Sequence, residues 1–218
     1  MNTITNIKTA ALAALITVGL FVQGSVVNAA GSETLTVAGG CFWCVEADFE
    51  KVKGVKGAVS GFAGGKAANP TYKQVTAGGT GHYEAVQITF DPSVVSAGKL
   101  LDLFFRSVDP TDAGGQFCDR GPSYRTAIFA TSGQKSTAEK AKSKAQSDLG
   151  QKIVTPILSA GKFYPADASH QDYAKGSSIV ITRFGPKTKA KAYKAYRKAC
   201  GRDKRVKELW GSAAPFAG

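Results

Sequence analysis

The most reactive side chains of this sequence are four cysteines, two of which stand three residues apart. Cys41 and Cys44 enclose Phe42 and Trp43, and the pair Gly39-Gly40 precedes them. Two glycines allow the backbone to turn sharply after a strand, so we expect Cys41 to begin a helix. Unpaired N–H groups and the helix dipole at such a position lower the pKa of a thiol and favour its nucleophilic form. The aromatic neighbours offer an apolar wall for a substrate.

A Cys-x-x-Cys pair alone is compatible with several chemistries. A thioredoxin-like dithiol–disulfide oxidoreductase would use Cys41 and Cys44, but the strand and helix that precede the active strand in that fold are missing. The spacing of two histidines and four cysteines fits no zinc-finger pattern, so we expect no bound metal. A non-catalytic binding protein, with a basic C-terminal helix that contacts an anionic partner, is the third interpretation.

The elements that must position the cysteines follow from hydrophobic periodicity and capping residues. We expect strands at residues 35–38, 55–62, 84–90 and 124–131, and helices at 42–51, from Asn69-Pro70 onward, at 96–108, at 134–149 and near 187–199. The order strand–helix–strand–strand–helix–strand is that of the split βαβ unit. The sequence therefore predicts an α+β fold, a ferredoxin-like two-layer plait with a mainly antiparallel sheet and extra C-terminal loops and a helix.

A carboxyl group, Glu84, opens the strand with the clearest alternation. By the period of two, it shares a face with Val86, Ile88 and Phe90. A carboxyl on a buried apolar face resists ionisation, so its pKa rises and it can act as a general acid near neutral pH. The alternative is that Glu84 lies at an exposed strand end beside Gly81.

Several separate motifs, in order, extend this pattern to nearly the whole chain. They are Gly40-Cys41-Phe42-Trp43, Asn69-Pro70-Thr71-Tyr72, residues 80–86, Asp109-Pro110-Thr111-Asp112, residues 119–125, His170-Gln171-Asp172-Tyr173, Cys200-Gly201-Arg202-Asp203 and Leu209-Trp210-Gly211. With them the sequence resembles the A-type peptide-methionine sulfoxide reductases, thiol-dependent enzymes specific for the S epimer. The resemblance implies the ferredoxin-like plait, with no bound cofactor and an external dithiol reductant of the thioredoxin type.

The resemblance also implies the roles of the site residues. Cys41 corresponds to the nucleophile that attacks the sulfoxide sulfur and becomes a sulfenic acid, and Glu84 to the acid that protonates the oxygen. The remaining matched positions are two phenols that hold the oxygen, a supporting carboxylate and the aromatic pocket for the substrate methyl group, namely Tyr72, Tyr124, Asp119, Phe42 and Trp43. His82 precedes a buried strand, and we expect it to be structural.

A second thiol must condense with the sulfenic acid to form a disulfide. We rank Cys44 first, because it lies within one helical turn of Cys41, and Cys200 second, because it matches the C-terminal resolving cysteine of many relatives. In one consistent scheme, Cys118 and Cys200 form a structural pair or act as a relay.

The N-terminus predicts export. Lys8 is the only charged residue in 1–29, an apolar run covers residues 10–22, and Val27-Asn28-Ala29 resembles a cleavage site. We therefore expect a signal peptide at 1–29, with a retained membrane anchor as the alternative, and one catalytic domain at 30–218. This indicates a periplasmic or secreted enzyme, with a donor outside the cytoplasm and no membrane contact beyond the signal segment.

The charge and composition of the sequence limit the classes of partner that we expect. The protein carries a net charge of +12, and the segment 183–208 holds eleven Lys or Arg residues against two acidic ones. No nucleic-acid module accompanies this charge, so we interpret it as a solvated helix face. The expected partners are oxidised proteins or peptides and the thioredoxin-like donor, and nothing requires more than a monomer. Whether free methionine sulfoxide is a substrate stays open.

Overall fold

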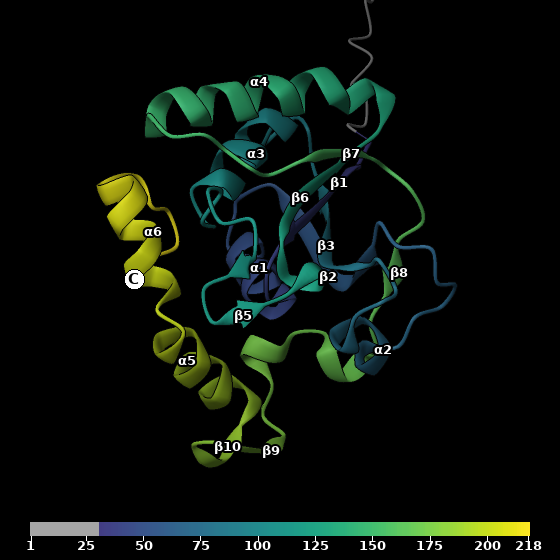
Figure 1. Ribbon diagram of the computed structural model, residues 1–218, viewed down its shortest axis with the longest axis vertical. Helices are drawn as coiled ribbons and strands as arrows, with labels where there is room; N and C mark the ends of the chain where they lie inside the picture. The colour runs from purple at the N-terminus through teal and green to yellow at the C-terminus, as the bar shows by residue number, and fades with distance from the viewer. Residues whose placement is uncertain (1–30) are drawn as a thin grey trace, which may run out of the picture.

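A six-stranded mixed sheet forms the centre of the computed structural model, which describes residues 31–218 (Figure 1). Its strand order is β7-β6-β1-β3-β2-β8. The strands are β1 (Glu33–Gly39), β2 (Val55–Ala63), β3 (Tyr83–Phe90), β6 (Thr126–Ala130), β7 (Ile157–Ser159) and β8 (Tyr164–Pro165). All neighbours pair antiparallel except β6 and β7, which are parallel. The predicted α+β class with a mainly antiparallel sheet is confirmed.

One face of this sheet carries the main hydrophobic core. Helices α1 (Phe42–Phe49) and α3 (Ala97–Phe105) pack on it, and α4 (Ser132–Leu149) covers α3 (Figure 1). Alternate side chains of the strands point into this layer, among them Leu35, Val37, Val86, Ile88, Phe90 and Ile128. Because β3 alternates, Glu84 belongs to the same face as Val86 and points toward the layer that contains α1.

The chain from residue 179 onward lies along one side of this core (Figure 1). It contains the hairpin β9 (Ile179–Thr182) and β10 (Gly185–Thr188), followed by α5 (Lys189–Ala199) and α6 (Arg202–Trp210). The remaining short elements are α2 (Tyr72–Ala77), the pair β4 (Gly115–Gln116) and β5 (Asp119–Arg120), and the 3-10 turns η1 (Pro122–Tyr124), η2 (Ala168–His170), η3 (Tyr173–Lys175) and η4 (Gly211–Ala213). Within residues 31–218, no helix combines the length and apolar character that a membrane span requires.

One predicted helix start is wrong. We expected Asn69 to cap α2 and Pro70 to be its first residue, but the helix begins at Tyr72 and Thr71 is its N-cap. Thr71 accepts a hydrogen bond from the backbone N–H of Gln74, whose side chain accepts one from the Thr71 backbone. This reciprocal capping box satisfies two donors, which a cap at Asn69 would not achieve. The predicted signal peptide lies outside the described residues, so it stays a prediction.

Candidate active site

Cys41 lies at the turn between β1 and α1, as its N-cap residue. Gly40 before it adopts a φ of +78°, and a Cβ there would lie 2.5 Å from the Gln116 Cβ, so glycine is required on both grounds. The backbone N–H groups of Cys44 and Val45 donate to the Cys41 carbonyl at 3.0 and 3.4 Å. The thiol is thereby held at the open end of a helix.

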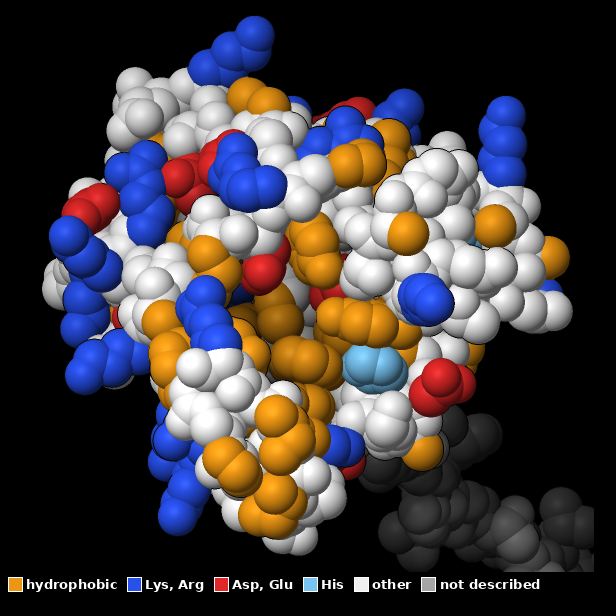
Figure 2. Space-filling model, turned by 60° about the horizontal axis from the view of Figure 1, so that its bottom comes forward, with side chains coloured by type: hydrophobic (Ala, Val, Ile, Leu, Met, Phe, Trp, Pro, Cys, Tyr) orange, Lys and Arg blue, Asp and Glu red, His pale blue; other side chains and the backbone are white. Residues whose placement is uncertain are grey.

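All nine residues selected from the sequence line one cavity of about 520 Å³, the hollow seen in Figure 2. They are Cys41, Phe42, Trp43, Cys44, Tyr72, Glu84, Asp119, Tyr124 and Cys200. Five separate segments contribute them: α1, α2, β3, the β5–η1 segment and the end of α5. The cavity therefore unites residues up to 159 positions apart in the chain.

Glu84 is the buried carboxyl of this cavity, only 1% exposed, so the alternative of an exposed strand end is excluded. Its Oε2 accepts a hydrogen bond from the backbone N–H of Phe42 at 3.0 Å. Its Oε1 is buried and has no hydrogen-bond partner among the described residues. Burial raises the pKa of Glu84 to about 8, against the lowering effect of the Phe42 N–H. Near neutral pH this group is a protonated acid with one free oxygen.

The thiols of Cys41 and Cys44 interact, and their ionisation is linked. This interaction is the main reason that the pKa of Cys44 falls to about 7, and Arg202 and Arg197 lower it further. The same interaction, burial and the neighbouring groups Glu84 and Asp119 raise the pKa of Cys41 above its usual value. The expectation of a lowered pKa at Cys41 itself is therefore wrong. The helix N-terminus does not outweigh burial and the neighbouring groups Cys44, Glu84 and Asp119 there.

Two phenols complete the polar part of the cavity. Burial is the main cause that raises the pKa of both Tyr72 and Tyr124, and the charge of Glu84 adds to it. Both hydroxyls therefore stay protonated and can donate hydrogen bonds throughout the physiological range. Asp119 is half-buried, and burial raises its pKa while Arg202 and Arg183 lower it.

The apolar part of the cavity is a set of stacked rings. Trp43 stacks on Tyr173 with ring centroids 3.7 Å apart. The His170 ring lies 4.3 Å from that of Tyr72 and 5.5 Å from that of Phe42. Sequence reasoning assigned no role to His170 and Tyr173, although both belong to a motif that it identified. They hold the aromatic wall in place.

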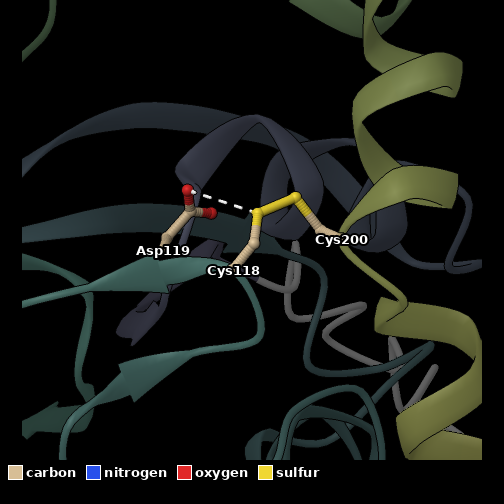
Figure 3. Close-up of a disulfide and its surroundings, with 3 residues drawn as sticks. All are labelled: Cys118, Asp119 and Cys200. Atoms are coloured by element: carbon tan, nitrogen blue, oxygen red, sulfur yellow. Dashed lines mark hydrogen bonds between the residues drawn. A yellow bond between two sulfur atoms is a disulfide. The ribbon is translucent and has the colours of Figure 1, made fainter.

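Cys118 and Cys200 form a disulfide at the edge of the cavity (Figure 3). It joins the segment before β5 to the end of α5 across 82 residues. Cys118 Sγ lies 3.8 Å from Asp119 Oδ1, a contact that Figure 3 shows. Cys41 and Cys44 are free thiols, so the structure pairs the four cysteines as in the scheme that leaves Cys44 beside the nucleophile.

Arg202 is the main residue that sequence reasoning missed. It is 2% exposed, and it donates to the carbonyls of Gly39 at 3.2 Å and Ser107 at 2.9 Å. Its guanidinium also lies 4.8 Å from the centre of the Phe117 ring. Arg202 thus fixes the end of β1 just before Cys41. The signal was its place beside Cys200 in a quoted motif.

His82 is structural, as expected. Its Nδ1 accepts a hydrogen bond from the Gly65 backbone at 3.1 Å, and its Nε2 lies 2.8 Å from the Ala67 carbonyl. Both ring nitrogens are therefore used to hold the loop after β2, and neither faces the cavity that contains Cys41.

Comparison with known proteins agrees with this site. Residues 33–212 match the family model described as "Peptide methionine sulfoxide reductase". The "Peptide methionine sulfoxide reductase MsrA 2" of Caulobacter vibrioides is 48% identical over 83% of this chain and 86% of its own. Its namesake from Rhizobium meliloti is 47% identical over 88% of this chain and 89% of its own.

Solved structures give the same result. Mxr1 from Saccharomyces cerevisiae in reduced form superimposes with a TM-score of 0.64 and 32% identity, over 68% of this chain and 87% of its own. Methionine sulfoxide reductase A of Corynebacterium diphtheriae has a TM-score of 0.60 and 32% identity, over 66% and 74% of the two chains. The chain that builds this thiol, carboxyl and aromatic cavity belongs to the A-type peptide methionine sulfoxide reductases, enzymes that reduce oxidised methionine and so repair oxidised proteins.

Proposed function

We propose that this enzyme reduces the S epimer of methionine sulfoxide with Cys41 as its nucleophile and Glu84 as its proton donor. One observation carries the proposal: Glu84 is buried, its pKa is raised to about 8, and its Oε1 is unpartnered among the described residues in the cavity that also contains Cys41. A free protonated carboxyl beside a nucleophile is suited to deliver a proton to the sulfoxide oxygen.

In the first step, the Cys41 sulfur attacks the sulfoxide sulfur, and Glu84 gives its proton to the sulfoxide oxygen. The pKa of Cys44 is lowered to about 7, so Cys44 is partly a thiolate near neutral pH and can take the proton that Cys41 loses. Oxygen transfer leaves a sulfenic acid on Cys41 and releases methionine. The substrate sulfur gains two electrons and the Cys41 sulfur loses two.

In the second step, Cys44 attacks the Cys41 sulfenic acid and forms a disulfide, and the hydroxyl group leaves as water after accepting a proton. The position of Cys44 within one helical turn of Cys41, in the same cavity, supports this order. Cys200 is the second-ranked resolving residue, and it is bonded to Cys118 in the structure. It can serve only after that disulfide has been reduced.

The cavity has an apolar aromatic side and a side with hydrogen-bond donors, and the two sides suggest how the substrate binds. We assign Phe42 and Trp43 to the substrate methyl group, because their rings form the apolar side of the cavity. Tyr72 and Tyr124 donate hydrogen bonds to the sulfoxide oxygen, and Asp119 supports the site. An apolar wall on one side and oxygen donors on the other discriminate between the two epimers, which differ in where the oxygen points.

The wider setting rests on the sequence. We propose export through the segment 1–29, a single catalytic domain at 30–218 and a monomeric enzyme. A thioredoxin-like dithiol outside the cytoplasm then reduces the disulfide, without a bound cofactor. The neighbour order β6-β1-β3-β2, antiparallel throughout, supports the ferredoxin-like plait as the fold.

Turnover of separated S and R epimers of a methionine sulfoxide peptide tests this proposal. With dithiothreitol as reductant, the wild type should reduce the S epimer only, and Cys41→Ser should abolish the activity. The double variant Cys118→Ser/Cys200→Ser is the matched control, because it removes the Cys118–Cys200 disulfide and leaves Cys41 and Cys44 in place. Equal turnover of both epimers, or full activity of Cys41→Ser, would contradict the assignment.

A further inference from the structure

The β9–β10 hairpin exposes an apolar face. The outer hairpin face consists of Ile179, Ile181 and Pro186, with Phe184 at its tip. Ile179 and Ile181 are 66% and 82% exposed, and Phe184 is 38% exposed. Among the described residues, the only other exposed large hydrophobic side chains are Val59 and Val94. Three of these five side chains therefore lie within six consecutive positions.

The alternation of β9 explains the arrangement. Val180, between the two exposed isoleucines, is half-buried and packs against the cluster that contains Tyr193. Ile181 pairs with Pro186 across the hairpin, so the side chains opposite the packed face form one continuous apolar surface. Nothing within residues 31–218 covers it. Stability alone does not require isoleucine at two exposed positions.

This surface is continuous with the active-site cavity. Ile181, Thr182 and Arg183 line the same cavity as Cys41. Figure 2 shows hydrophobic side chains gathered on the projecting lower part of this face, next to the hollow. A methionine sulfoxide within a polypeptide carries backbone on both sides, and that backbone must leave the cavity across its rim. An extended segment of three residues spans about 10 Å, enough to pass over the hairpin face.

Charge further defines the occupant. The segment between Asp172 and Asp203 contains nine Lys or Arg residues and no acidic residue. Lys175 and Arg197 are paired with carboxylates and Arg202 is buried, which leaves six of the nine for the surface charge. Within the described part of the chain, Arg183 on the rim and Lys187 on β10 form no ion pair. The hairpin is therefore apolar on its outer face and positively charged around it, which suits a segment with apolar and acidic side chains.

We propose that the outer hairpin face binds the polypeptide segment that flanks the oxidised methionine and favours flanks with apolar and acidic residues. This inference rests on the proposed function and adds to it a preference for the residues that flank the oxidised methionine. The thioredoxin-like reductant, which must also reach the cavity, is the competing occupant.

Steady-state kinetics with three substrates test the proposal on the full-length enzyme. The substrates are N-acetyl-methionine-S-sulfoxide, a heptapeptide with a central methionine-S-sulfoxide flanked by Leu and Asp, and the same peptide with Lys in place of Asp. The Leu-Asp peptide should have the lowest KM, and its advantage over the Lys peptide should shrink in high salt. Ile179→Ser should raise the KM for the Leu-Asp peptide about ten-fold and leave kcat unchanged.

Ile179 does not line the cavity, so Ile179→Ser should turn over N-acetyl-methionine-S-sulfoxide as the wild type does. Val94→Ser is the matched control, because Val94 is 50% exposed elsewhere on the surface and should change neither substrate. Equal KM values for the Leu-Asp peptide in wild type and Ile179→Ser would overturn the inference. A rise only in the KM for a thioredoxin reductant would overturn it too, and would assign the face to the donor. Wild type inactive on every substrate would instead refute the proposed function.

Discussion

Replacing Glu84 by glutamine removes the proposed proton donor while keeping the shape and a hydrogen-bonding oxygen for the Phe42 N–H. General acid catalysis by a positioned group contributes roughly 10²- to 10⁴-fold, so kcat/KM for a methionine-S-sulfoxide peptide should fall by about that factor. Burial holds the pKa of Glu84 at about 8. In the wild type, kcat/KM should therefore fall about ten-fold per pH unit above pH 8, as the acid is lost.

The rising, acidic side of the same pH profile reflects the ionisation of the thiols. Because the pKa of Cys44 is lowered to about 7, its capacity to accept the Cys41 proton is lost below that pH. The wild type should show a bell-shaped profile with a maximum between pH 7 and 8. The variant should keep the acidic limb and lose the alkaline one. Methionine release, measured chromatographically from pH 5.5 to 10 with dithiothreitol in excess, gives both limbs.

Stability provides an independent readout of the same pKa. The folded-state pKa of Glu84 is raised from 4.5 to about 8. Its contribution to stability is therefore complete below pH 4.5 and is lost as the pH rises toward 8. At 1.36 kcal/mol per pH unit this amounts to about 5 kcal/mol. Glutamine does not titrate, so Glu84→Gln should gain stability relative to the wild type between pH 5 and 9 in urea unfolding.

Two results would refute the reasoning about Glu84. A variant with more than a tenth of wild-type kcat/KM would show that the proton comes from elsewhere. A wild-type profile that keeps rising to pH 10 would show that no buried acid is required. In the second case, a stability difference that does not change with pH would confirm that Glu84 ionises normally in the folded protein.

Three further substitutions test the neighbouring groups. Cys44→Ser should release one methionine per enzyme in a single turnover and accumulate the Cys41 sulfenic acid. Mass spectrometry detects this acid after trapping with dimedone. A rapid Cys41–Cys200 disulfide would instead make Cys200 the resolving residue. Tyr124→Phe should lower kcat/KM about 10²-fold by removing one donor to the oxygen, and an unchanged value would argue against that role. Arg202→Met should lower the free energy of unfolding in urea by about 3 kcal/mol, because the buried carbonyls of Gly39 and Ser107 lose their partner. A decrease below about 1 kcal/mol would contradict the anchoring role of Arg202.

The core elements could be predicted because their signals are local. Alternation placed β3 within one residue of its observed bounds, and Ser96, at which the predicted helix 96–108 begins, is the N-cap of α3. The period of two indicated the face on which Glu84 lies, whereas its role as the acid was implied by the family resemblance. The predicted start of α2 was wrong because two local motifs compete there, Asn69-Pro70 and the capping box of Thr71 with Gln74. Only the capping box satisfies both backbone donors.

The surroundings of the site could not be predicted, because long-range packing determines them. Nothing in the sequence near Arg202 reveals that its guanidinium reaches the carbonyl of Gly39, 163 residues earlier. The β9–β10 hairpin escaped detection because its strands are four residues long and basic residues surround them. The partner of Cys118 likewise depends on how α5 docks against the segment before β5.

The thiol pair shows how a correct local argument gives a wrong result when its neighbours are unknown. The N-terminus of α1 does favour negative charge, but Cys41 also faces Glu84 and Asp119, which oppose it. The positive charges of Arg202 and Arg197 lower the pKa of Cys44. When one of the two cysteines is ionised, the negative charge is therefore favoured on the sulfur of Cys44. In the proposed mechanism, the half-exposed thiol of Cys41 meets the substrate, and the buried thiol of Cys44 carries the charge, accepts the proton and then closes the disulfide. A low pKa at the attacking sulfur would have reduced its nucleophilicity, whereas in this proposed mechanism Cys44 acts as a base and activates Cys41 only as the bond to the substrate forms.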